Sequence, residues 1–270
     1  MSRIESTFGN LIGQGRKALI PFITAGDPHP AMTVSLMHAL VDAGADIIEL
    51  GVPFSDPMSD GPVIQRASER ALKSGTSLKG ILEMVLEFRR KDDHTPVVLM
   101  GYLNPFEAMG YGKFAHEAKR AGVDGVLTVD CPPEEAGELL EAFSGEGIEP
   151  IFLLSPTTSK ERIGKVAKFA SGYVYYVSLK GVTGATHLDF SEIEARVSEI
   201  RKAIDLPVCV GFGIRDEQTA KSASKIADGV VIGSRIVQEI ENSDKESVVR
   251  NVSAFIAAMR NAIDGKKEST

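Results

Sequence analysis

The chain contains no tryptophan and only two cysteines among its 270 residues. Cys131 and Cys209 are too few for a disulfide framework, and sparse cysteine is typical of proteins in a reducing compartment. No apolar run approaches the roughly 20 residues that a membrane-spanning helix requires. The N-terminal segment MSRIESTFGN also lacks the apolar stretch of a secretory signal. The composition therefore predicts a cytoplasmic protein without a membrane segment.

Basic clusters are missing as well. The formal net charge is −7 at pH 7, which argues against nucleic acids and anionic membranes as partners. The metal-ligand spacings HxxxH and CxxC do not occur, and the carboxylates show no ligand-like cluster. We therefore predict neither a metal site nor a nucleic-acid or membrane partner.

Eight short apolar runs alternate with helical patterns, and most of them end at Gly, Pro, Ser or Thr. The runs are Leu19–Thr24, Asp46–Gly51, Val97–Gly101, Gly125–Val129, Pro150–Leu154, Tyr173–Ser178, Val208–Gly211 and Gly229–Gly233. Strict alternation of strands and helices predicts parallel strands with right-handed crossovers. Eight such units favour one (β/α)8 barrel, a TIM barrel, formed by residues 1–270 as a single domain. A doubly wound sheet is the alternative.

Three features are expected in addition to the eight units. Residues 1–14 predict an amphipathic N-terminal helix, capped by Ser2, that could plug one end of the barrel. The long connection after the second strand and the run Arg235–Glu241 predict extra helices after strands 2 and 8. The polar residues 265–270 predict a disordered tail. The other helices are expected at Ala31–Ala43, Leu78–Lys91, Gly112–Ala121, Pro133–Phe143, Lys160–Ala170, Phe190–Ile204, Glu217–Lys225 and Asn251–Ile263.

The stretch DIIELGVPFSDPMSDGP, from Asp46 to Pro62, places a glutamate inside an apolar strand. Both faces of a barrel strand are apolar, so the carboxyl group of Glu49 is expected to be largely dry and its pKa to be raised. Such a group suits general acid–base catalysis, although pairing with a Lys or Arg is the alternative. Asp60 ends the following loop at the barrel rim, where it could bind a substrate N–H. Turn formation explains Asp56 and Asp60 equally well.

Glycines cluster near the ends of strands 6, 7 and 8. They occur in GVTG, GFG and GS, which begin at Gly181, Gly211 and Gly233, and the last segment opens a helix. Glycine allows close approach of the backbone to a ligand, and N–H groups at a helix N-terminus attract phosphate. Loops after strands 7 and 8 are a recurrent phosphate site in such barrels. We therefore expect a phosphate monoester ligand that is held without a metal.

Apolar and aromatic residues are expected to face the barrel interior between the carboxylates and this phosphate site. Most of them fit plain core equally well, and those nearest the strand ends could line a slot for a flat apolar group. Of the histidines, only His187 is expected near this face of the barrel, and its position favours no role. The inward residues are Phe22, Met100, Tyr102, Leu127, Val129, Leu153, Tyr175, Phe212 and Ile232.

Several segments closely resemble the α subunits of tryptophan synthase. They are PFITAGDP, ADIIELGVPFSDPMSDGPVIQ, GYLNP, GVTGA and GFGI, in this order and spacing. The similarity runs from about Ile4 to about Ile263, and ELGVPFSDP followed by DGPVIQ is its most specific part.

The resemblance implies a lyase of tryptophan biosynthesis with a TIM-barrel fold. Its reaction is the retro-aldol cleavage of indole-3-glycerol phosphate to indole and glyceraldehyde 3-phosphate. It also implies a β subunit that receives the indole, within an α2β2 complex. The cofactor pyridoxal phosphate would belong to that partner, and no cofactor is expected in this chain.

The family's functional positions match residues of this chain one by one. Its catalytic glutamate and aspartate match Glu49 and Asp60. Its substrate tyrosine matches Tyr175, and its loop threonine matches Thr183. The matching phosphate positions are Gly184, Phe212, Gly213, Gly233 and Ser234, and the loop that meets the β subunit includes Pro53, Asp56 and Pro57. The chain departs from many family members at Leu179, Lys180 and Thr186, which implies differences in how the loop after strand 6 closes.

Two other functions remain as alternatives. Another phosphate-binding barrel, such as an indole-glycerol-phosphate synthase or a sugar-phosphate isomerase, would be expected to use a Lys, Cys or metal at a strand end. No expected strand ends in Lys, and Cys209 lies inside its strand. A degenerate subunit that only activates a partner is the non-enzymatic alternative, and the intact Glu49 and Asp60 argue against it.

Overall fold

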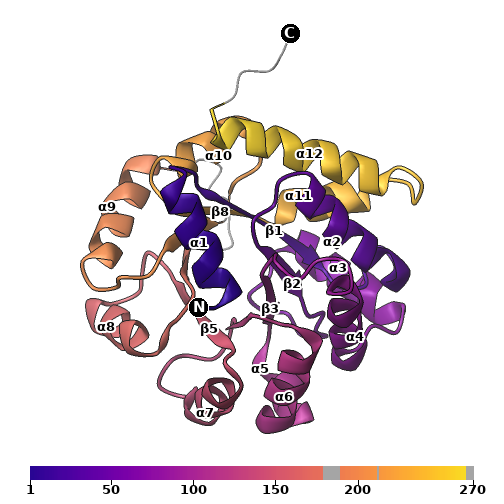
Figure 1. Cartoon of the computed structure of the whole chain (residues 1–270), viewed down its shortest axis with the longest axis horizontal. Helices are drawn as coiled ribbons and strands as arrows, with labels where there is room; N and C mark the ends of the chain where they lie inside the picture. The colour runs from indigo at the N-terminus through magenta and orange to yellow at the C-terminus, as the bar shows by residue number, and fades with distance from the viewer. Residues whose placement is uncertain (179–188, 212, 266–270) are drawn as a thin grey trace.

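The computed structural model describes residues 1–178, 189–211 and 213–265. Eight parallel strands close into a barrel in chain order, and helices surround it (Figure 1). The strands are β1 (Ala18–Thr24), β2 (Ile48–Gly51), β3 (Val97–Gly101), β4 (Gly125–Thr128), β5 (Glu149–Leu154), β6 (Val174–Val177), β7 (Val208–Gly211) and β8 (Gly229–Ile232). Because β1 pairs with both β2 and β8, the sheet has no edge. The predicted (β/α)8 barrel is confirmed, and a doubly wound sheet is excluded.

The described helices include the extra ones expected at the N-terminus and after strands 2 and 8. They are α1 (Arg3–Gly13), η1 (Pro30–Met32), α2 (Thr33–Asp42), α3 (Pro62–Lys73), α4 (Leu78–Phe88), α5 (Leu103–Met109), α6 (Tyr111–Ala121), α7 (Gly137–Glu146), α8 (Lys160–Phe169), α9 (Phe190–Arg201), α10 (Glu217–Ser224), α11 (Ser234–Glu241) and α12 (Val248–Ile263). Within the described ranges, no helix combines the length and apolar character needed to cross a membrane.

Several helix ends differ from the expected bounds by up to three residues, such as the start of α12 at Val248 in place of Asn251, and two larger differences have a local cause. Helix α5 was not predicted, because Asn104 and Pro105 are typical of a turn. A proline is nevertheless tolerated in the first turn of a helix, and the buried Phe106 anchors this one to the core. Helix α7 begins at Gly137, four residues later than expected, because a turn closed by the bond from Glu135 N to Pro132 O precedes it.

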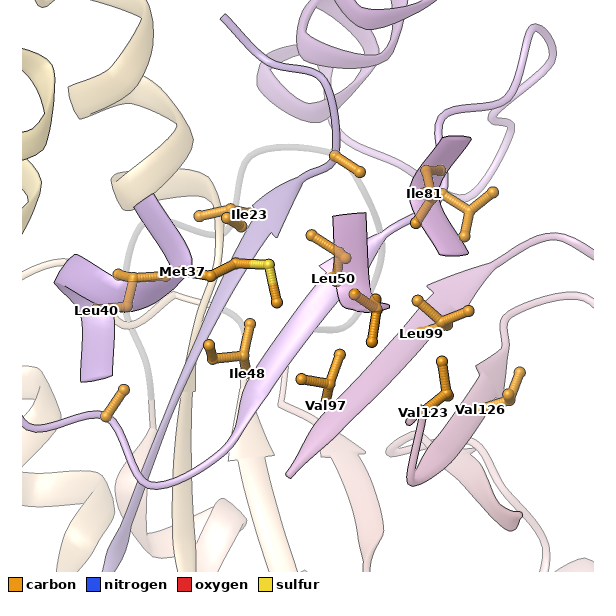
Figure 2. Packing of buried hydrophobic residues seen from close by; sticks show 14 of the residues in the cluster. Ile23, Met37, Leu40, Ile48, Leu50, Ile81, Val97, Leu99, Val123 and Val126 are labelled. Atoms are coloured by element: carbon orange, nitrogen blue, oxygen red, sulfur yellow. The ribbon is translucent and has the colours of Figure 1, made fainter. Parts of the chain in front are cut away.

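Strand side chains alternate between the barrel interior and the helix layer. The outer cluster packs β1 to β4 against helices α2 and α4, as Figure 2 shows for Ile48, Leu50 and their neighbours. Ile232 also belongs to this outer cluster, whereas the preceding Val231 faces the interior. The expected inward orientation of Ile232 is therefore wrong. The interior cluster contains Ala18, Ile20, Ile47, Val98, Leu127, Ile151, Tyr173, Tyr175, Cys209 and Val231.

Helix α1 covers the end of the barrel at which the strands begin (Figure 1). Its buried residues Ile4, Phe8 and Leu11 join the interior cluster, so the predicted plug is confirmed. The ring of Phe8 lies 6.0 Å from the ring of Tyr173, measured between centroids. The predicted cap is also present, since Ser2 Oγ accepts a hydrogen bond from the backbone of Glu5.

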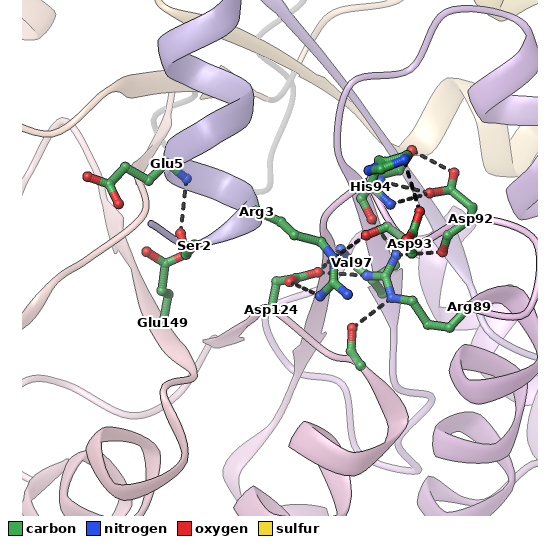
Figure 3. Close-up of polar contacts among 12 residues, drawn as sticks. Ser2, Arg3, Glu5, Arg89, Asp92, Asp93, His94, Val97, Asp124 and Glu149 are labelled. Atoms are coloured by element: carbon green, nitrogen blue, oxygen red, sulfur yellow. Dashed lines mark hydrogen bonds and ion pairs between the residues drawn. The ribbon is translucent and has the colours of Figure 1, made fainter.

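Charged side chains fix this helix to the start of the strands (Figure 3). Arg3 Nη1 donates to Asp124 Oδ1 at 2.9 Å, and Ser2 Oγ donates to Glu149 Oε2 at 3.1 Å. Asp124 also accepts from Arg89 Nη2 at 2.7 Å, and both of these side chains are almost fully buried. We call Arg89 and Asp124 the lower pair, because they lie at the end of the barrel opposite the strand carboxyl ends.

Candidate active site

A cavity of about 640 Å³ opens at the carboxyl ends of the strands. Glu49 of β2 and Asp60 of the loop after β2 line it, together with Phe22 of β1. Gly213, beyond β7, and Gly233, beyond β8, line it as well. The structure therefore brings the two carboxylates and part of the glycine set into one space.

Glu49 is fully buried, and its side chain reaches the cavity from the barrel interior. Burial raises the pKa of this carboxyl group to about 7, although a hydrogen bond from Tyr173 opposes the shift. Tyr173 Oη donates to Glu49 Oε1 at 2.6 Å. In the described part of the chain, Oε2 has no hydrogen-bond partner and Glu49 forms no ion pair. Glu49 is thus placed to gain or lose a proton near neutral pH.

Asp60 lies at the end of the loop that follows β2. Burial raises the pKa of its carboxyl group to about 6, and a hydrogen bond from Tyr102 lowers it in part. Tyr102 Oη donates to Asp60 Oδ2 at 3.3 Å and accepts from the backbone N–H of Ser59 at 2.9 Å. The Tyr102 ring stacks on Phe54 of the same loop, with centroids 5.2 Å apart. Tyr102 therefore holds the loop and its carboxylate against the barrel.

The other side of the cavity suits an anion. Gly233 precedes the first turn of α11 and no side chain caps that end of the helix. The first N–H groups of a helix have no acceptor within it, so those of Ser234 and Arg235 are available to a ligand. Gly213 has a φ of +76°, which a side chain would disfavour. Arg215 and Arg235 also line the cavity and add positive charge there.

The remaining predicted residues fall into three groups. Tyr175 lines the cavity, Tyr102 lines a small adjoining pocket with Asp60, and Leu127 lies fully buried in the barrel interior. Ile232 faces the helix layer instead. The third group lies outside the described residues. It comprises Thr183 and Gly184 after β6 and Phe212 after β7, together with Leu179, Lys180, Thr186 and His187, which also follow β6.

The loop proposed to meet a partner is exposed in part. Pro53 is buried, Pro57 is half-buried and Asp56 is exposed. Met58, between Pro57 and Asp60, leaves 82% of its surface exposed. Exposed methionines are common at protein-binding surfaces.

Sequence reasoning missed three residues of the site. Tyr173 could have been found, because it lies two positions before Tyr175 and so shares its side of the strand. A buried tyrosine hydroxyl also usually has a hydrogen-bond partner. Arg215 and Arg235 directly follow the GFGI and GS segments, and their charge was the available signal. Among the described residues, no three His, Cys, Asp or Glu side chains gather as a metal site would require.

Comparisons with known proteins point to one family. The family model described as "Tryptophan synthase alpha chain" matches residues 8–264. The tryptophan synthase alpha chain of Chromobacterium violaceum is 62% identical over 97% of this chain and 100% of its own length. That of Nitrosomonas europaea is 60% identical over 99% of this chain and 98% of its own length. The crystal structure of tryptophan synthase subunit alpha from Legionella pneumophila superposes with a TM-score of 0.92 at 45% identity, covering 98% of this chain and 99% of that one.

Proposed function

The chain belongs to the tryptophan synthase alpha chain family, and we propose that Glu49 moves the protons of the family's reaction while Asp60 stabilises the charged ring. The reaction cleaves indole-3-glycerol phosphate to indole and glyceraldehyde 3-phosphate in tryptophan biosynthesis. The chain is a lyase, and its partner is the β subunit of tryptophan synthase.

Cleavage of the bond between indole C3 and the glycerol chain requires two proton transfers. Protonation of C3 turns the ring into a leaving group, and the adjacent hydroxyl must lose its proton as it becomes an aldehyde. Because burial raises its pKa to about 7, a large share of Glu49 is protonated near neutral pH, and this form donates its proton to C3. The resulting carboxylate then accepts the hydroxyl proton as the carbon–carbon bond breaks. Glu49 therefore ends the reaction protonated, as it began, and can start another turnover.

Asp60 has a different task, because its environment differs. With a pKa of about 6, its carboxyl group is mostly ionised at pH 7. Protonation of C3 places positive charge on the ring nitrogen, and the Asp60 carboxylate stabilises that charge by accepting the hydrogen bond from N1–H. Two carboxyl groups with separated pKa values commonly divide acid and base roles in this way.

The phosphate of the substrate is assigned to the glycines and to helix α11. Gly213, Gly233 and Ser234 would contact it through backbone N–H groups and a hydroxyl, and Arg215 and Arg235 would add charge. Phe22, Tyr102 and Tyr175 would pack on the indole and glycerol parts. Resemblance to the family assigns Thr183, Gly184 and Phe212 to the substrate as well. Leu127, which the strand pattern predicts to line the site, lies in the barrel interior, whereas Ile232 faces the helix layer and is given no part in binding.

The loop after β2 would meet the β subunit through Pro53, Asp56 and Pro57 in an α2β2 complex. The exposed Met58 on this loop supports such a contact. No step above needs a cofactor in this chain, and we assign pyridoxal phosphate to the β subunit. We also propose a cytoplasmic location, which fits two free, buried cysteines.

The observation that carries the proposal is the fully buried Glu49, with a pKa of about 7, in one cavity with Asp60. The test is release of indole from indole-3-glycerol phosphate by Glu49→Gln, with and without the β subunit. General acid–base catalysis is worth about 10²- to 10⁴-fold, so the rate should fall at least that far. The exposed Glu138→Gln is the control, and near-normal indole release by Glu49→Gln would exclude the role of Glu49.

A further inference from the structure

A network of four charged side chains lies beside the cavity without lining it. Asp27, in the loop after β1, is fully buried and binds Arg70 of α3 through two bonds, Nε to Oδ1 at 2.7 Å and Nη2 to Oδ2 at 3.0 Å. Arg70 Nη1 also donates to Glu241 Oε1 at 2.7 Å, at the end of α11. Arg66, one turn before Arg70, donates to both oxygens of Glu241 at 2.7 Å each.

These contacts join the elements that carry the two halves of the site. Helix α3 starts at Pro62, two residues after Asp60, so its position sets where that carboxylate lies. Helix α11 starts at Ser234, where the phosphate is assigned. The two helices also pack through Ala67 and Val237, which share a small apolar cluster with Phe22. The network therefore ties α3 to α11 and both of them to the end of β1.

Burial raises the pKa of the Asp27 carboxyl group, and the hydrogen bonds and charge of Arg70 oppose that rise. Hydrogen bonds from Arg66 and Arg70 lower the pKa of Glu241 to about 2. Burying an ion pair is not an efficient source of stability, since apolar residues of similar volume often do as well. Directional bonds from a planar guanidinium do fix geometry, because each donor points along a set direction. The arrangement suits accurate placement of two helices better than it suits stability.

We propose that Asp27 and Arg70 are positioning residues that set the distance between Asp60 and the phosphate end of the cavity. This inference rests on the proposed function, in which a substrate held by its phosphate must present its ring nitrogen to Asp60. A displacement of about 1 Å at a reacting group can reduce a rate about 100-fold. Loosening α3 against α11 should therefore lower kcat while leaving the phosphate contacts of α11 intact.

The chain offers a matched control at the other end of the barrel. The lower pair, Arg89 and Asp124, is also a buried Arg–Asp pair with a 2.7 Å contact (Figure 3). It holds α4 and the start of β4 together, and neither residue lines the cavity. Breaking the lower pair should reduce stability without moving Asp60.

The experiment compares Asp27→Asn, Arg70→Lys, Glu241→Gln and Arg89→Met with wild type, each in complex with the β subunit. Four quantities are measured: kcat and KM for indole-3-glycerol phosphate, the Kd of glycerol 3-phosphate, and the thermal midpoint. Glycerol 3-phosphate is the probe because it has the phosphate and lacks the ring. Glu241 is partly exposed, so Glu241→Gln should fold even if Asp27→Asn does not.

We expect Asp27→Asn and Glu241→Gln to lower kcat by about tenfold or more, with the Kd of glycerol 3-phosphate changed by less than about twofold. Arg70→Lys keeps the charge and should recover part of kcat. Arg89→Met should lower the thermal midpoint and leave kcat unchanged. The inference is overturned if Glu241→Gln and Asp27→Asn keep the wild-type kcat. It is also overturned if every variant, Arg89→Met included, loses kcat in proportion to its thermal midpoint.

These outcomes are separable from failure of the proposed function. If Glu49→Gln is inactive and Asp27→Asn has normal kcat, only the positioning role is wrong. If the wild-type complex does not cleave the substrate, the proposed function is wrong and the positioning role falls with it.

Discussion

The hydroxyl of Tyr173 lies 2.6 Å from one oxygen of Glu49, while the other Glu49 oxygen meets no hydrogen-bond partner in the described part of the chain. The two residues are 124 positions apart and both are fully buried. The bonded oxygen fixes the carboxyl group, and the unpartnered oxygen is left to exchange a proton with a ligand. This arrangement leads to the first three predictions.

The pH profile of kcat/KM should be a narrow bell-shaped curve. Glu49 must be protonated, which fails above about pH 7, and Asp60 must be ionised, which fails below about pH 6. The value of kcat/KM for indole-3-glycerol phosphate, which reports the free enzyme, should therefore peak between these values. The second ionisation of the substrate phosphate, near pH 6, also contributes to the acid limb. Measuring the Kd of glycerol 3-phosphate across the same pH range separates that contribution, and a flat profile from pH 5 to pH 9 would contradict the assignment.

The stability of Glu49→Gln relative to wild type should increase as the pH rises. The ordinary pKa of a glutamate is 4.5, whereas folded Glu49 keeps its proton to about pH 7. The folded state therefore binds the additional proton between these values, and the contribution of Glu49 to the free energy of unfolding falls by about 3 kcal/mol as the pH rises through this window. Glutamine has no proton to lose.

Urea unfolding at pH 5 and pH 8 measures this difference. The free energy of unfolding of Glu49→Gln, relative to wild type, should increase between the two values. Glu138→Gln, at an exposed position, should show no such increase. An equal pH dependence in wild type and Glu49→Gln would show that Glu49 is ionised at pH 5.

Tyr173→Phe should shift the basic limb of the rate profile upward. The Tyr173 hydroxyl donates to the carboxylate and so lowers the pKa of Glu49. A hydrogen bond to a charged group is worth about 1.5–3 kcal/mol, so its loss should raise that pKa by about one unit or more. Tyr176→Phe is the control, because Tyr176 lies on β6, which directly follows Tyr173, and faces the outer layer. If the midpoint pH of the basic limb is the same in Tyr173→Phe and wild type, the Tyr173 hydroxyl does not affect the pKa of Glu49.

Arg215→Met should weaken substrate binding without slowing the chemistry. Arg215 lines the cavity, and its contact with Asp216 is 3.7 Å long. That carboxylate also caps α10, so much of the guanidinium charge is available to a phosphate. KM and the Kd of glycerol 3-phosphate should rise several-fold at low salt, and the difference should shrink at high salt. Arg90→Met, exposed at the opposite end of the barrel, should change neither, and a lower kcat in Arg215→Met would point to another role.

Local signals in the sequence were sufficient for the barrel. Each strand shows its own apolar run, and Glu49 is conspicuous within one of them. Local signals failed where the structure of a segment depends on the residues that pack against it. The Asn104-Pro105 pair suggests a turn, yet Phe106 packs in the core and a helix forms. The orientation of Ile232 was predicted incorrectly. The side that a strand residue faces depends on the register between neighbouring strands, which the sequence of the strand itself does not reveal.

The sequence alone could not predict long-range contacts, for a related reason. The run of apolar residues that predicts β6 does not indicate that Tyr173 meets Glu49 across the barrel. Asp27 and Arg70 are 43 positions apart, and neither stands out among the charged residues of the chain. Only the folded barrel shows which of these side chains are brought together.

The plug formed by α1 has a consequence for how Glu49 communicates with bulk water. Phe8 and its neighbours cover the start of the strands, and Tyr173 stands between this helix and the Glu49 carboxyl group. The cavity mouth is therefore the route by which hydrogen ions reach Glu49, and a bound ligand occupies that route. The rate of hydrogen isotope exchange at the Glu49 carboxyl group should then be limited by the dissociation rate of the bound ligand. The pKa of Glu49 should have little influence on that rate.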